Sequence, residues 1–102
     1  MERLIEIGKI IPKKSVDVKK SILGLSFEKL DRDVFDPEKA YEHVAKLGVK
    51  WARLQSGWQR TEREKGVYNF EWLDKVVDNM ISIGVEPWLC LCYGNDLYSV
   101  NA

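Results

Sequence analysis

The sequence predicts an α/β fold with parallel strands. Between residues 48 and 95 a strand-like segment, a polar loop, a helical segment and a second strand-like segment follow one another. This order is the repeating unit of parallel α/β folds. Polar and aromatic side chains gather where each strand ends, which is the edge at which such folds bind ligands.

Residues 3 to 20 differ in character from the rest of the chain. Their aliphatic residues alternate loosely with polar ones on both sides of Pro12-Lys13-Lys14-Ser15. This pattern predicts two short strands about a turn, with lysines on the outward side. We therefore expect a short N-terminal β-element over residues 1–20 and a βαβαβ portion over residues 21–102.

The first strand of the repeating pattern runs from Ser21 to Glu28. Residues 23, 25 and 27 are apolar, whereas residues 24, 26 and 28 are small or polar, so one face is suited to covering helices and the other to a polar interior. Asp36-Pro37 opens the first helix, because Asp is a strong N-cap and Pro fits the first helical position. Gly48 ends it.

The second strand, residues 49–55, follows at once, and its alternation places Trp51, Arg53 and Gln55 on one face. The second helix begins after Asn69, a favourable N-cap, and its apolar residues from 73 to 81 follow the helical period. Gly84 ends this helix, and residues 85–93 are predicted as the third strand. The sheet is expected to have right-handed crossovers.

The overall composition argues against several classes of function. Sixteen basic residues balance sixteen acidic ones, so no global attraction to nucleic acid or to an anionic membrane is predicted. No apolar run approaches the roughly 20 residues that span a bilayer, and the N-terminal residues lack the pattern of a signal peptide. We expect a cytoplasmic protein that contacts neither nucleic acid nor membrane and that needs no cofactor or metal.

The face that bears Arg53 and Gln55 is the first candidate site. An arginine inside a strand carries a desolvation cost unless a carboxylate or phosphate pairs with it. Glu28, at the end of the neighbouring strand, is such a partner. A structural salt bridge and a ligand site are compatible interpretations, because the pair can itself form part of a site.

Aromatic and amide side chains follow the second and third strands. Trp58 is a natural platform for the apolar face of a sugar ring, although packing beneath the loop explains it equally well. Tyr93 and Asn95 end the third strand, where turn formation is the alternative. Paired carboxylates can hydrolyse glycosides, but sequence spacing does not establish their separation.

Four segments together resemble a known family. They are Leu47 to Arg53, Trp58, the run Glu64 to Asp74 and Gly84 to Leu89, and Phe27 to Arg32 fits the preceding strand and loop. They resemble the N-terminal part of clan A glycoside hydrolases, which are (β/α)8 barrels, of the β-xylosidase (family 39-like) type. The resemblance covers about residues 21 to 98, and Gly-x-Tyr-Asn-Phe-x-x-Leu-Asp, beginning at Gly66, is its most specific part.

This resemblance implies a partial (β/α)8 TIM barrel consisting of the first three parallel strands and two helices. It implies a retaining mechanism whose two glutamates belong to strands four and seven, so no catalytic residue is expected here. Asn95-Asp96 falls one strand early for the acid/base pair and has Asp in place of Glu. The histidine that many clan members carry near the end of strand three is absent.

The resemblance also implies a carbohydrate substrate and a set of substrate-binding residues. Arg53 matches the arginine that braces the nucleophile. The predicted pocket consists of Glu28, Arg53, Gln55, Trp58, Tyr93 and Asn95. Three strands leave open sheet edges, so we expect an N-terminal fragment of a β-xylosidase-like hydrolase that self-associates or pairs with a complementary barrel fragment. The alternative is a non-catalytic, self-associating module that is sugar-binding or purely structural.

Overall fold

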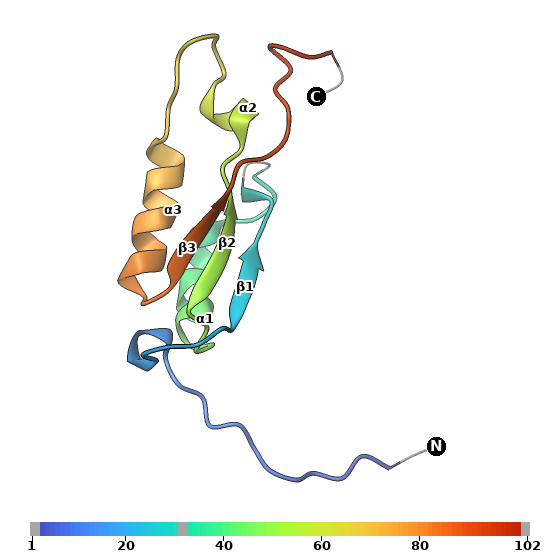
Figure 1. Cartoon of the computed structure of the whole chain (residues 1–102), viewed down its shortest axis with the longest axis vertical. Helices are drawn as coiled ribbons and strands as arrows, with labels where there is room; N and C mark the ends of the chain where they lie inside the picture. Colours follow the sequence, from blue (N-terminus) through green and yellow to red (C-terminus); the bar gives the residue numbers. More distant parts are fainter. Residues whose placement is uncertain (1–2, 31–32, 101–102) are drawn as a thin grey trace.

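The computed structural model describes residues 3–30 and 33–100, and within them a parallel three-stranded sheet is the central element (Figure 1). The strands are β1 (Gly24–Phe27), β2 (Trp51–Gln55) and β3 (Glu86–Cys90), in the order β1-β2-β3. Both strand pairs are parallel. The predicted α/β fold is therefore confirmed. The described sheet is open, and closure into a barrel stays a prediction.

Helices precede and connect the strands. η1 (Ser15–Asp17) lies before β1, η3 (Pro37–Lys39) and α1 (Tyr41–Ala45) lie between β1 and β2, and α2 (Trp58–Thr61) and α3 (Glu71–Ser82) lie between β2 and β3. Asp36 caps η3 through its carboxylate, which accepts a hydrogen bond from the Glu38 backbone N–H at 3.0 Å. The Asn69 side chain likewise accepts from the Glu71 N–H at 3.0 Å at the start of α3. Both expected side chains thus bind a backbone N–H at a helix start, although the N-cap residue of α3 itself is Phe70.

The core lies between the sheet and the helices α1 and α3, which cover the same face (Figure 1). Ala52 and Leu54 of β2 are completely buried on this face, together with Met80 of α3. Burial of such aliphatic side chains is the main stabilising contribution to a small domain. The predicted alternation of β2 is confirmed, because Trp51 and Arg53 point to the opposite face.

No helix among the described residues covers that opposite face of the sheet (Figure 1). This face forms an open depression of about 450 Å³ whose lining includes Ser26, Trp51, Arg53 and Trp88. The register places Arg53 of β2 between Ser26 of β1 and Trp88 of β3. Parallel sheets normally have both faces covered, so this face is unusual in exposing large aromatic side chains.

The prediction that residues 1–20 form a β-element is wrong for the described residues 3–20. Residues 3–14 form no strand, and residues 1–2 lie outside the described residues. The segment runs away from the sheet (Figure 1), and Ile7 and Ile10 are almost fully exposed. Alternation alone does not make a strand, because a strand also needs a neighbour that completes its hydrogen bonds. The division of the chain near residue 20 stays a prediction.

Further elements differ from the sequence-based expectation. β1 begins at Gly24 rather than at Ser21, and the first helix is divided into η3 and α1. β3 ends at Cys90 rather than at residue 93, and Tyr93 has a left-handed backbone with φ of 65°. The segment after β2 contains the short helix α2 instead of only a polar loop. No helix within the described residues is long and apolar enough to cross a membrane.

Candidate functional site

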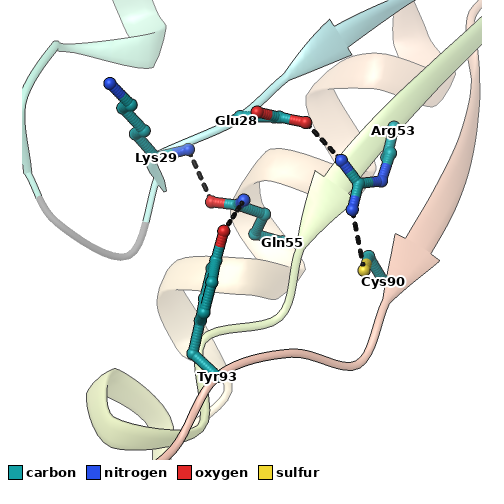
Figure 2. A network of polar contacts seen from close by, with 6 residues as sticks. All are labelled: Glu28, Lys29, Arg53, Gln55, Cys90 and Tyr93. Carbon is teal, nitrogen blue, oxygen red and sulfur yellow. Dashed lines mark hydrogen bonds and ion pairs between the residues drawn. The ribbon is translucent and has the colours of Figure 1, made fainter. Parts of the chain in front are cut away.

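An ion pair between Arg53 and Glu28 lies at the carboxyl end of the sheet (Figure 2). β2 positions the arginine, and Glu28 follows β1 directly. The Arg53 guanidinium also donates to the Cys90 Sγ at 3.2 Å. The Cys90 side chain and, to a smaller extent, Glu28 raise the pKa of Arg53. Both members of the pair remain partly exposed to solvent, so a ligand can reach them.

Gln55 connects the ends of all three strands (Figure 2). Its side-chain oxygen accepts from the Lys29 backbone N–H at 2.6 Å, after β1. Its amide nitrogen donates to the Tyr93 hydroxyl at 3.1 Å, after β3. The Gln55 side chain is buried, and each of its polar groups has a partner. Gln55 therefore holds the two flanking loops in register with β2.

An aromatic groove adjoins this cluster. It measures about 420 Å³, and its lining is mostly apolar: Ser56, Trp58, Thr61, Tyr68, Phe70, Leu91, Cys92 and Tyr93. Trp58 begins α2 and is 41% exposed. Tyr93 belongs to both regions, because it lines the groove and its hydroxyl accepts a hydrogen bond from Gln55. The polar cluster and the groove are thus continuous.

Glu62, which is not among the six predicted residues, is the centre of a second cluster of polar contacts. It directly follows α2 and is 0% exposed. Its carboxylate accepts from the Trp58 indole at 2.8 Å, from the Gly66 N–H at 2.8 Å and from the Tyr98 hydroxyl. A signal was present in the sequence, because Glu62 lies four residues after Trp58, a spacing at which helical side chains meet.

Asn95 belongs to this second cluster. Its amide donates to the Glu62 carbonyl at 2.8 Å, and its side-chain oxygen accepts from the Leu97 N–H at 2.9 Å. The residue is buried, so in this structure it anchors the segment after β3 to α2. This is the turn-like role that the sequence left open, and a contact with substrate stays a prediction.

The structure therefore divides the six predicted residues between two neighbouring clusters. Glu28, Arg53, Gln55 and Tyr93 come together around the carboxyl end of β2. Trp58 and Asn95 lie around Glu62. The predicted salt bridge between Arg53 and Glu28 is confirmed. A ligand-binding role for each of the six residues stays a prediction.

A parallel α/β sheet with polar side chains at the carboxyl ends of its strands defines a class of ligand-binding α/β proteins. The family model of glycoside hydrolase family 42, described as beta-galactosidase, matches residues 25–94, and the chain belongs to this family. The matched range includes every predicted site residue except Asn95. The predicted resemblance to glycoside hydrolases is confirmed, but its assignment to the family 39 β-xylosidase type finds no support.

One curated relative is beta-galactosidase BgaH from Haloferax lucentense. It is 32% identical to this chain over 54 residues, which cover 52% of this chain and 8% of the relative. The chain therefore spans a small part of the length of this relative. No solved structure matches the chain.

Proposed function

We propose that the chain is the N-terminal βαβαβ portion of a β-galactosidase-type barrel and supplies part of its sugar-binding surface. The cluster of Arg53, Glu28 and Gln55 at the carboxyl edge of the sheet carries this proposal. In (β/α)8 enzymes the active site lies at this edge. Membership of the beta-galactosidase family supports a carbohydrate substrate.

The chemistry of the two regions suits a glycoside. The Arg53 guanidinium and the Glu28 carboxylate supply charged hydrogen-bonding groups for sugar hydroxyls. The aromatic groove beside them supplies apolar surface for the C–H face of a sugar ring. Because the matched family is described as beta-galactosidase, a β-galactoside is the first ligand to test, and a β-xyloside is the comparison.

We further propose that the two catalytic carboxylates lie outside this chain, so the chain alone binds sugar without hydrolysing it. Glu28 is paired with Arg53, and Glu62 is buried beneath three hydrogen-bond donors. Neither has the environment of a general acid facing a substrate. The missing part of the site would come from a complementary barrel segment, and the protein would work in the cytoplasm.

The test is a titration of the full chain with methyl β-galactoside, followed by NMR chemical shifts. We expect saturable binding that Arg53→Ala weakens by about tenfold or more, because a charged hydrogen bond contributes about 1.5–3 kcal/mol. Arg63→Ala is the matched control, since Arg63 is an exposed arginine outside both clusters. Absence of binding would refute the proposal. Hydrolysis of a nitrophenyl galactoside that disappears in Arg53→Ala would place catalysis within this chain.

The uncovered face of the sheet favours a second candidate function, that of a self-associating α/β module. Trp51 and Trp88 are exposed there, and both β1 and β3 have an unpaired edge within the described sheet. Oligomerisation that is indifferent to galactoside, without any binding of it, would favour this candidate.

A further inference from the structure

The buried Glu62 carboxylate is the starting point. Burial of a carboxylate is costly unless its oxygens are paired. No lysine, arginine or histidine among the described residues forms an ion pair with Glu62. Neutral donors take this role, among them the indole of Trp58, the N–H of Gly66 and the hydroxyl of Tyr98. Each donor must point toward the carboxylate to keep its hydrogen bond, so the buried charge restricts the orientation of these groups.

Trp58 is the donor whose direction matters for the groove. An indole has a single N–H, so one bond from Nε1 to the Glu62 carboxylate at 2.8 Å restricts the rotation of the ring. The Tyr98 ring stacks on the Trp58 ring, with centroids 5.2 Å apart and planes inclined by 18°. Glu62 also holds Tyr98. Two contacts that both depend on Glu62 therefore orient the same ring.

We propose that Glu62 is a positioning residue for sugar binding, which holds the Trp58 ring in the orientation that lines the aromatic groove. This inference rests on the proposed sugar-binding function and extends it to a residue that no ligand needs to touch. Pre-organisation raises affinity because the free energy of ordering a side chain is spent before the ligand arrives.

The surroundings of Glu62 predict a charge that persists at neutral pH. The Tyr98 hydroxyl has the largest effect, and with the Gly66 N–H, the Trp58 indole and the Tyr68 hydroxyl it lowers the pKa of Glu62 below its ordinary value. The ammonium of Lys65 lies 5.2 Å from the centre of the Tyr98 ring. Trp58 begins α2, residues 65–68 follow this helix, and Tyr98 lies in the segment after β3. Protonation of Glu62 would weaken its hold on Trp58.

Fluorine NMR of the full chain labelled with fluorotryptophan tests this directly. The chain has four tryptophans, and Trp58→Phe identifies the Trp58 signal. We expect this signal to titrate with a midpoint below that of an ordinary glutamate. Glu62→Gln should abolish the titration, whereas Glu64→Gln, a neighbouring exposed control, should preserve it. A Trp58 signal that Glu62→Gln leaves unchanged would overturn the proposal.

Affinity for methyl β-galactoside provides the second readout. Glu62→Gln should weaken binding by about threefold to tenfold, the scale set by ordering one side chain. In a Trp58→Phe background the same change should have little further effect, because its route to the ligand is already removed. Fully additive effects would show that Glu62 does not act through Trp58.

The two arms separate failure of the positioning role from failure of the proposed function. If the unmodified chain binds no galactoside, the sugar-binding proposal fails, and the fluorine titration still decides whether Glu62 orients Trp58. Where Glu62→Gln does not fold, Glu62→Asp replaces it: this variant keeps the charge but withdraws the carboxylate. We expect a titration that persists with a displaced Trp58 signal, and an undisplaced signal would contradict the proposal.

Discussion

At the scale of single residues, two glutamates that directly follow β1 and α2 are stabilised in different ways. Glu28 is partly exposed and pairs with a cation, Arg53. Glu62 is buried and pairs with neutral donors. A partly exposed ion pair can exchange its partner for a ligand at modest cost, whereas a buried carboxylate cannot leave its donors without a large penalty. This contrast assigns binding to the first and positioning to the second.

Tyr98 allows a prediction of stability against pH. Its hydrogen bond to Glu62, followed by burial, raises the pKa of Tyr98 from the ordinary value of 10.0 to about 12. A raised pKa in the folded state means that the stabilisation is complete below pH 10 and is lost as the pH rises toward 12. Urea unfolding at increasing pH should therefore show a decline of the free energy of unfolding over this interval.

Tyr98→Phe should reduce the decline of the free energy of unfolding between about pH 10 and about pH 12, because phenylalanine has no proton to lose. Tyr93→Phe, which leaves the Glu62 cluster intact, serves as the control and should retain it. An equal decline in the unmodified chain and in Tyr98→Phe would show that the bond to Glu62 does not contribute.

At the scale of secondary-structure elements, the sequence predicted helix starts and strand faces better than it predicted the N-terminal segment, which pairs with no strand among the described residues. Asp36 and Asn69 were recognised because a cap is a local interaction. The faces of β2 followed from alternation alone. The N-terminal residues were mispredicted because pairing of strands is a long-range property. The role of Glu62 could not be predicted, because one of its hydrogen-bond donors, Tyr98, lies far along the chain.

Gly84, which follows α3, tests how this element docks on the rest of the chain. Its φ is 80°, and a Cβ added there would lie 2.4 Å from the Val16 Cα. Gly84→Ala should therefore combine left-handed strain with a steric collision and lower the free energy of unfolding by about 2–5 kcal/mol. Chemical denaturation measures this loss.

Gly66 is the matched control for Gly84. Its φ is 81°, but a Cβ there would have no neighbour within 4 Å. Gly66→Ala should therefore show the backbone strain alone, about 1–2 kcal/mol. Equal losses for the two variants would mean that the backbone around Val16 yields freely and that its contact with Gly84 is unimportant.

At the scale of the whole molecule, the helices of the described residues cover one face of the sheet and leave the other open (Figure 1). The open face holds Arg53 and Glu28, with Trp88 level with Arg53 on the neighbouring strand and Trp51 nearer the amino end of β2. In a closed barrel the equivalent face is the packed interior. Polar groups for a ligand and apolar groups for packing therefore share one surface, which is the arrangement expected of one part of a barrel.

Exposed aromatic residues on that surface predict association that depends on concentration. Trp88 is 62% exposed and belongs to the uncovered face. Trp88→Glu should weaken self-association, or pairing with a complementary barrel segment, by about tenfold or more, since buried tryptophans are frequent hot spots of interfaces. Leu47→Glu is the control, because Leu47 is also 62% exposed but follows α1 on the helical side. Sedimentation across a range of concentrations measures the effect, and a compact monomer with a cooperative melt at every concentration would show that the open face needs no partner.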